Sequence, residues 1–396
     1  MLKIPPFFLL CSSGLFAIFS STISKSPVLP LFAEHLGANP TGVGIIAGVS
    51  AFTGVIASIP AGIFSDRFGR KRMILFSAII FSTAPFLYLF VTNIWQLALV
   101  RFYHGFATAI FIPVAMALVA DYFQEERGEK MGWFSSSTLA GRFLAPIVGG
   151  SVLGVLAFNP SISYKAVYLI CGIAGLITLT LIIRLPNPTV VENKGFSGKE
   201  LFESFRIVIT NKIILTTCIV EATILFAYGT FETFLPLYSK RIGLTTYEIG
   251  ILLSSQIITF ALTKPMMGKF SDRHGRKPQI FVGAIIGSLC IGSFFIFKSF
   301  IPLLTLSILF GFCLSIVTSA TSAFIADLSR ENTRGSAMGT LGSIMDIGHT
   351  TGPIVAGIIA SSFGMGYSFI GASIVLAAIA FIFLIGVMIR SNPQTT

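Results

Sequence analysis

A small set of ionisable side chains in this 396-residue chain falls inside long apolar stretches, where an isolated charge is costly. The first half of the chain contributes three cations, Lys25, Arg101 and Arg142. The second half contributes three acids, one lysine and one histidine: Glu221, Glu232, Asp346, Lys264 and His349. A carboxylate in poorly hydrated surroundings is easily protonated, and a nearby cation reverses that effect. The chemistry available is therefore proton exchange and charge pairing.

The three acids are candidates for a group that takes up and releases a proton. Arg101 or Arg142 is expected to modulate that group, and Arg101 and His349 are further candidates for proton coupling. Asp346 and His349 stand three residues apart, so on a helix they lie on neighbouring faces. The alternative for each of these residues is a static salt bridge between helices, and the sequence leaves both interpretations open.

A second set of side chains could contact a substrate directly. We assign Lys25, Arg101, His104, Arg142 and Glu232 to it. The cations favour an anionic or zwitterionic substrate. Alternatively, they neutralise the acids of the second half and the substrate is a lipophilic cation.

Several function classes find no support in the sequence. All five cysteines lie in apolar stretches without CxxC spacing, which is typical of small packing residues. There are four histidines, no cluster with metal-ligand spacing and no nucleotide-binding loop. We therefore expect no enzyme, no metal, no cofactor and no nucleic-acid partner.

The elements that carry these side chains are expected to be membrane helices. The chain is 54% hydrophobic and 11% charged, and it contains 39 Phe residues. Apolar segments of about 20 residues cross a bilayer as helices, since lipid offers no partners for free backbone groups. Charged and turn-rich points divide the chain into twelve such segments: 7–31, 42–63, 73–93, 95–120, 132–157, 165–184, 211–237, 247–267, 279–297, 300–326, 337–361 and 366–389.

The basic residues predict the orientation of these segments. Nineteen of the 27 lysines and arginines fall in loops and ends on one side, and four fall in loops on the other side. By the positive-inside rule, both termini are expected in the cytoplasm, with the protein in the plasma membrane. The net charge of +11 is thus explained by topology. The first segment is too long and too weakly flanked for a cleaved signal peptide.

An internal repeat divides the chain in two. The run from Gly62 to Arg72 returns from Gly268 to Pro278 with eight of eleven positions identical, at an offset of 206 residues. This repeat predicts an N-terminal six-helix bundle at 1–184 and a C-terminal one at 211–396. The polar stretch 185–210 between them is expected to be a cytoplasmic linker, either with an interfacial helix or partly ordered.

Each copy of the repeated run should form a charged turn between two helices. Gly62 and Gly268 are expected to end a helix where it approaches a neighbour closely, and Gly69 and Gly275 to permit the turn. The basic residues, Arg67 and Arg273 among them, anchor the loop at the membrane surface. Asp66 and Asp272 could each cap the N-terminus of a facing helix.

With these residues, the sequence resembles the major facilitator superfamily over nearly its whole length. The run Gly62-x-x-x-Asp66-Arg67-x-Gly69-Arg70-Lys71 is similar to that family's signature loop. The resemblance implies a gate latch in which Asp66 meets the start of the eleventh helix and Arg70 pairs with Asp121. For the second copy it implies Asp272 and a pair of Arg276 with Asp327. We call these the first and the second latch.

Two further spans resemble motifs of the same family. Arg101-x-x-His104-Gly105 in the fourth span is similar to the Arg-x-x-Gln-Gly motif of proton-coupled members. The fifth span resembles the antiporter motif, with small residues that let helices pack closely and a proline that bends the helix. The residues of this antiporter-like motif are Gly141, Ala145, Pro146, Gly149 and Gly150.

The resemblance implies an all-α membrane protein with twelve helices in two pseudo-symmetric bundles and a central site between them. It implies a monomeric secondary transporter in the lipid bilayer that works by alternating access, with protons as coupling ion and a small molecule as substrate. Proton-driven efflux of drugs or amphipathic metabolites is the favoured activity. Proton-coupled uptake or exchange of a small organic anion is the second reading, and a non-transporting receptor or scaffold is the third.

Overall fold

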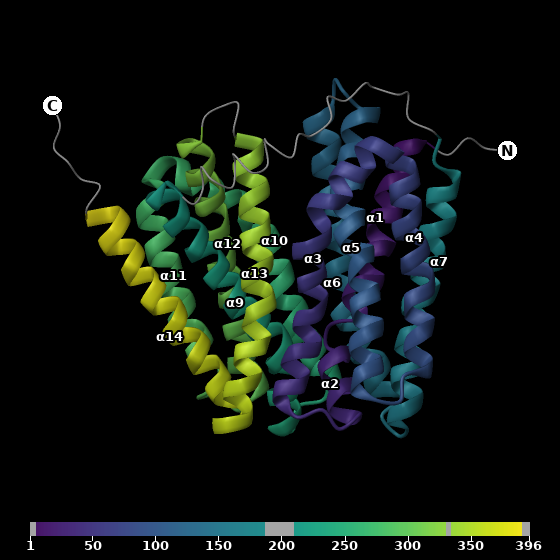
Figure 1. The fold of residues 1–396 in the computed structure, drawn as a ribbon. Coiled ribbons are helices and arrows are strands. Elements are labelled where there is room, and N and C mark those ends of the chain that lie inside the picture. Colours follow the sequence, from purple (N-terminus) through teal and green to yellow (C-terminus); the bar gives the residue numbers. More distant parts are fainter. Residues whose placement is uncertain (1–4, 187–209, 330–333, 390–396) are drawn as a thin grey trace. The chain divides into compact units, whose positions relative to one another are not determined.

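The computed structural model describes residues 5–186, 210–329 and 334–389, with the side chains of Ile59, Ile63, Asp66 and 334–340 outside that description. Within these ranges the chain forms twelve long helical segments (Figure 1), as predicted. The first six are α1 and α2 (Pro6–Ile23 and Val28–His35), α3 (Pro40–Phe68), α4 (Arg70–Leu87), α5 (Ile94–Tyr122), α6 (Arg127–Val155) and α7 (Pro160–Arg184). The second six are α9 (Lys212–Arg241), α10 (Thr246–His274), α11 (Arg276–Ser293), α12 (Phe300–Leu328), α13 (Arg334–Phe363) and α14 (Met365–Phe383), which continues as a π-helical turn over Leu384–Ile389.

Ten of these segments are long and apolar enough to cross a membrane by length and composition alone, among the residues described. The two that fall short are α11 and α13. The first turn of α11 is Arg276-Lys277-Pro278-Gln279, which lowers its mean hydropathy. The predicted linker at 185–210 lies almost wholly outside the described residues.

The first span differs from the single helix expected over 7–31. It breaks between Ile23 and Val28, so that α1 and α2 are separate helices. Pro27 has no N–H to donate, and it disfavours helical geometry in the residue before it. The matching position in the second half is Thr233, and α9 runs through it without a break.

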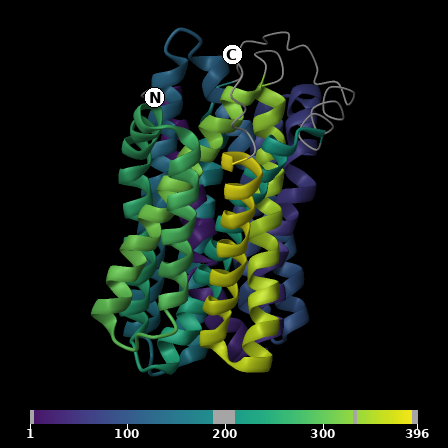
Figure 2. The same cartoon turned by 90° about the vertical axis from the view of Figure 1, so that its left-hand side faces the viewer.

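The chain divides into two compact units. Unit 1 comprises Met1–Ala38, Val49–Phe196 and Thr245–Ser254, and unit 2 comprises Asn39–Gly48, Ser197–Leu244 and Ser255–Thr396. In unit 1, α1 packs on α6 and α7, and α4 packs on α5 and α7. In unit 2, α9 packs on α13 and α14, and α11 packs on α12 and α14 (Figure 2). The two units thus repeat one packing scheme.

Candidate functional site

The first latch contains an ion pair in unit 1. Arg70 is the first residue of α4, and Asp121 lies in the last turn of α5. The Nε atom of Arg70 lies 2.9 Å from Oδ2 of Asp121, and the two side chains are 14% and 16% exposed. The structure therefore brings together the two residues that the resemblance pairs, in a largely shielded position.

The second latch has a different environment. Arg276, the first residue of α11, places Nε 3.0 Å from Oδ2 of Asp327 and Nη1 2.5 Å from Oδ1 of Asp272. The side chains of Asp327 and Asp272 are 56% and 61% exposed. Burial lowers the pKa of Arg276, but the hydrogen bonds and charges of these two acids outweigh burial and raise it.

The structure corrects the roles expected for Gly62 and Gly268. Neither ends a helix, because α3 continues to Phe68 and α10 to His274. A Cβ atom at either glycine would meet nothing within 4 Å among the described residues, so no close approach requires them in this conformation. The chain turns at Gly69 and Gly275 instead.

Gly69 and Gly275 make those turns, as expected. Their φ angles are +94° and +91°, a region that side-chain-bearing residues rarely adopt. Arg67 lies at the end of α3 and Arg273 at the end of α10, both exposed. The side chain of Asp66, residues 330–333 and the side chains of 334–340 lie outside the described part. The cap that Asp66 is expected to form therefore stays a prediction.

Two of the candidate proton carriers form a contact in unit 2. Glu232 lies on α9 and His349 on α13, and His349 Nε2 is 3.2 Å from Glu232 Oε2. Their side chains are 9% and 18% exposed. The ring of Tyr228, one turn before Glu232, stacks on the His349 imidazole with 5.4 Å between ring centroids. A carboxylate and an imidazole in this arrangement can share one proton.

Glu221 occupies a separate position on α9 and is completely buried. Its Oε2 atom accepts a hydrogen bond from the hydroxyl of Thr321 on α12. Its Oε1 atom has no hydrogen-bond partner among the described residues, although Lys264 on α10 interacts with Glu221 electrostatically. Such a carboxylate has one oxygen available for a proton. Asp346 is half-buried on α13, one turn before Thr350, whose hydroxyl donates to its carbonyl.

The buried cation of unit 1 is Arg101 on α5, which is only 2% exposed. Its Nη1 atom donates to the Ser24 hydroxyl at 3.2 Å, and Ser24 lies in the break between α1 and α2. The side chain also interacts with Tyr88. Among the described residues Arg101 has no acidic partner, and its Nε atom has no acceptor.

His104 belongs to the same cluster. It is 2% exposed, and its Nδ1 atom lies 3.4 Å from the hydroxyl oxygen of Tyr88. Tyr88 in turn stacks on Tyr168 at a centroid distance of 4.2 Å. The structure thus joins two sequence candidates, Arg101 and His104, through a tyrosine that the sequence did not single out. The other two first-half candidates differ in burial: Lys25 is half-buried, and Arg142 is exposed on α6.

The antiporter-like motif on α6 forms two packing faces within unit 1. A Cβ atom at Gly141 would clash with the backbone of Leu15 on α1, and Gly149 lies against Ile23 and Val28. A Cβ atom at Gly150 would clash with the carbonyl of Thr246, in the part of α10 that belongs to unit 1. Ala145 and Pro146 are both buried.

Unit 2 repeats this arrangement on α13. Added Cβ atoms at Gly348 and Gly352 would clash with the backbone of α9, at Ala222 and Phe226. Gly357 lies against Pro40 in the part of α3 that belongs to unit 2. Both fifth helices of the repeat therefore use glycine to approach other helices at backbone distance.

Comparisons with known proteins agree with this architecture. The chain is 25% identical over 370 residues to multidrug resistance protein 1 of Bacillus subtilis, covering 92% of each chain. It is 27% identical over 348 residues to the multidrug resistance protein MdtG of Klebsiella pneumoniae, covering 85% of this chain and 83% of that protein.

A solved structure supports the fold. A bacterial homologue of the human lysosomal transporter Spinster, crystallised in an inward-facing and unoccupied conformation, superposes with a TM-score of 0.84 at 16% identity, covering 98% of both chains. The family model of the Major Facilitator Superfamily matches residues 10–254 and 242–395. The chain therefore belongs to the Major Facilitator Superfamily and is an integral membrane transporter of that family.

Proposed function

We propose that this chain exports drugs or amphipathic metabolites in exchange for protons, by alternating access. Two relatives named as multidrug resistance proteins support the cargo class. The observation that carries proton coupling is the largely buried contact between Glu232 and His349.

The contact provides a proton site with few accessible charge states. In a low-dielectric environment an unpaired ion is costly, so the pair is stable with one shared proton on either group. Adding a second proton gives the pair a net positive charge, and removing the shared proton gives it a net negative charge. Because Glu232 and His349 lie on different helices, a movement of α9 against α13 separates them and changes the affinity of each for a proton.

The remaining acids have supporting roles in this proposal. Glu221 keeps one oxygen without a hydrogen-bond partner in the described residues and can take a proton there. Asp346 lies close to His349 along α13 and can modulate its charge. On the side of unit 1, we assign Lys25, Arg101, His104 and Arg142 to the binding of the cargo.

Reconstituted vesicles test the proton coupling. Purified protein is placed in liposomes with an imposed pH gradient, and the accumulation of ethidium and the lumenal pH are followed together. We expect the unchanged protein to accumulate the dye while protons leave the lumen. Glu232→Gln and His349→Gln should lose gradient-driven accumulation yet keep dye exchange at equal pH, since exchange needs no net proton movement.

Glu125→Gln is the matched control, because Glu125 is an exposed acid between α5 and α6. It removes the same charge outside the proposed proton site and should behave like the unchanged protein. If gradient-driven accumulation survives neutralisation of Glu221, Glu232 and Asp346 together, the proposal of proton coupling through these acids is wrong.

A second candidate function is proton-coupled uptake or exchange of a small organic anion. The observation in its favour is Arg101, a buried guanidinium without an acidic partner in the described residues. The same vesicles distinguish the two, because accumulation of succinate instead of ethidium, lost in Arg101→Gln, would favour the anion. Folded protein that moves neither class of solute would favour a receptor or scaffold.

We further propose that both termini, both latches and the linker 185–210 face the cytoplasm, that the protein is a monomer in the plasma membrane, and that the bundles comprise 1–184 and 211–396. The excess of basic residues in these loops supports this orientation. A single cysteine at Lys194 in the linker should react with a membrane-impermeant maleimide only after the cells are opened. Labelling in intact cells would reverse the topology.

A further inference from the structure

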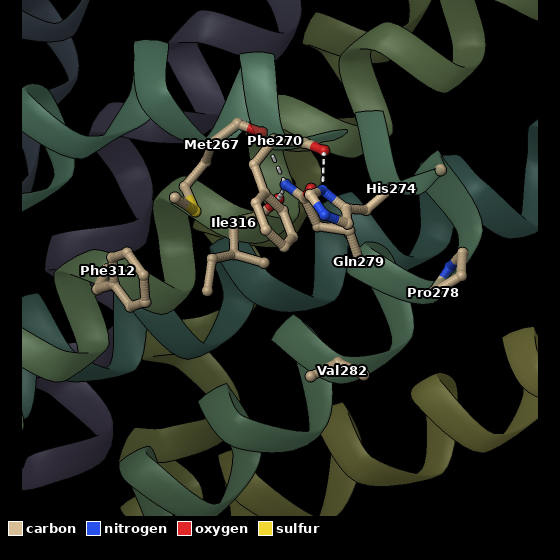
Figure 3. A pocket seen from close by; sticks show the side chains of 9 residues that line it. Met267, Phe270, His274, Pro278, Gln279, Val282, Phe312 and Ile316 are labelled. Carbon is tan, nitrogen blue, oxygen red and sulfur yellow. Dashed lines mark hydrogen bonds between the residues drawn. The ribbon is translucent and has the colours of Figure 1, made fainter. Parts of the chain in front are cut away.

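We propose that a pocket beside the second latch binds an uncharged, membrane-soluble phenol, at a site independent of the exported cargo. The pocket has a volume of about 470 Å³ and lies within unit 2, among the end of α10, the start of α11 and the middle of α12. Figure 3 shows the side chains around it. Ligand sites for drug-sized molecules commonly have volumes of about 300–1,000 Å³.

The walls of the pocket are apolar and partly aromatic. Met267 and Phe270 come from α10, and Phe312 and Ile316 come from α12 (Figure 3). Phe270 is 47% exposed near the end of α10, where the repeated run is expected at the membrane surface, so the pocket is accessible to molecules that partition into the bilayer. The Phe270 ring stacks on His274 at a centroid distance of 4.1 Å, which forms a flat surface for an aromatic ligand.

One polar group in the wall lacks a partner. Gln279 on α11 is 6% exposed, and its Nε2 atom donates to the carbonyls of Met267 at 3.0 Å and Ile316 at 3.1 Å. These two bonds fix the amide and tie α11 to α10 and α12. The Oε1 atom has no hydrogen-bond partner among the described residues and is out of reach of water. A buried acceptor without a donor is unfavourable, and a ligand that brings an O–H group removes that cost.

His274 lines the same pocket as Gln279. Its side chain is exposed, and its Nδ1 atom is 3.2 Å from the carbonyl of Phe270, which is its one hydrogen bond in the described structure. A ring with a single hydrogen bond can rotate when a ligand enters. The flanking side chains Arg273 and Lys277 are positive, which disfavours a cationic ligand. A neutral or weakly acidic donor fits, and a phenol combines both properties with an aromatic ring.

The first half of the chain shows that this site is particular to the second half. At the offset of 206 residues, His274 corresponds to Phe68 and Gln279 to Met73. Neither Phe nor Met can donate or accept a comparable hydrogen bond. The same turn in the two halves is therefore apolar in one and carries a polar pair in the other. The first-half residues supply substitutions that suit this backbone.

Protection of a cysteine tests the proposal. The reporter carries Cys11→Ser and Met267→Cys, because the other four native cysteines are buried and unreactive. In detergent-free nanodiscs, the rate of maleimide labelling is measured against 4-octylphenol and against 4-octylanisole, which has the same shape but no donor. We expect the phenol to protect Cys at 267 at about fivefold lower concentration than the anisole, the effect of one hydrogen bond.

Substitutions from the first half complete the test. Gln279→Met with His274→Phe should equalise the two compounds. Val282→Phe, which brings the first-half residue Phe76 into the pocket and leaves the hydrogen bonds of Gln279 intact, should weaken both. A reporter at Leu289, exposed on α11 away from the pocket, should show no protection.

Three results would overturn the proposal: no protection, equal protection by phenol and anisole in the unchanged pocket, or a difference that persists in Gln279→Met with His274→Phe. Equal protection would show that the pocket binds apolar molecules through its walls alone, as it would bind a lipid acyl chain, without a hydrogen bond to Gln279. Because labelling requires no proton gradient and no transport, a failure of the proposed export would leave this result standing.

Discussion

The two latches have matching sequences but different surroundings. Arg70 and Asp121 are 14% and 16% exposed, whereas Asp327 and Asp272 around Arg276 are more than half exposed. Exposed pairs contribute about 0–1 kcal/mol, while breaking a shielded pair strands a charge in a low-dielectric environment. The repeated motif therefore forms the same ion pair in both halves, but the free energy that each pair contributes differs.

The buried charges diverge in the same way. Unit 1 buries the cation Arg101, and unit 2 buries the acids Glu221 and Glu232. The packing of helices is nevertheless repeated in both units, including the glycines of α6 and α13. The duplicated fold is a common scaffold on which each half carries its own chemistry.

Substitution of the packing glycines on α6 and α13 is expected to give the largest loss of stability, and a similar loss in both halves. In each half the glycine lies against the backbone of a neighbouring helix. Gly141→Val and Gly348→Val both force a side chain into the backbone of a neighbouring helix. Each should lower the free energy of unfolding by about 3 kcal/mol, at the upper end of the cost of overpacking. Thermal unfolding in detergent measures this. Alanine at the same positions should give a smaller loss of stability. A loss in only one half would show that the two halves do not share this packing.

The first latch comes next. Arg70→Gln removes the guanidinium that lies 2.9 Å from the largely shielded Asp121 carboxylate, so we expect a loss of about 2 kcal/mol, below the cost for a fully buried pair. A double-mutant cycle with Asp121→Asn isolates the pair itself, since the double variant strands no charge. Additive single effects would show that the two side chains do not interact.

How far these features could be predicted from the sequence depends on whether they follow from spacing or from packing. Twelve apolar segments and a repeat at one offset are properties of spacing, and they are sufficient to predict the fold and the family. The break between α1 and α2 also has a signal in the sequence. Pro27 lies in the break, and the matching position in the second half is Thr233, which allows the helix to continue. The continuation of α3 past Gly62 follows from the weak helix-breaking effect of one glycine, against the positive φ required at Gly69.

The partners of the buried charges could not be predicted. Thr321 lies 100 residues from Glu221, and Ser24 lies 77 residues from Arg101. Which hydroxyl faces a charge depends on the rotation of each helix about its axis. Apolar spans with almost no hydrophobic asymmetry do not specify that rotation. Gln279 has no signal in the sequence for the same reason, because its role depends on the two carbonyl groups to which its amide donates.

The second latch should respond less than the first. Asp327→Asn removes an exposed acid from Arg276 and leaves Asp272 in place, so the expected loss of stability is about 0.5 kcal/mol. It should shrink further in 1 M salt, where exposed charges are screened. Arg70→Gln should keep most of its effect under the same salt. Equal salt sensitivity of the two latches would contradict the difference in burial.

An effect of similar size and opposite sign is expected at Gly62 and Gly268, and transport measured alongside stability separates two roles of these glycines. Both are helical and face open space among the described residues, so alanine should raise the stability of this conformation by about 0.5 kcal/mol through the unfolded state. If close helix approach at these positions occurs in another step of the transport cycle, the same alanines should slow dye accumulation in vesicles. A gain in stability with slower transport would therefore assign the glycines to a second conformation. A gain with unchanged transport would leave them without a role in the latch, and the two latches would then share only their ion pairs and their turns at Gly69 and Gly275.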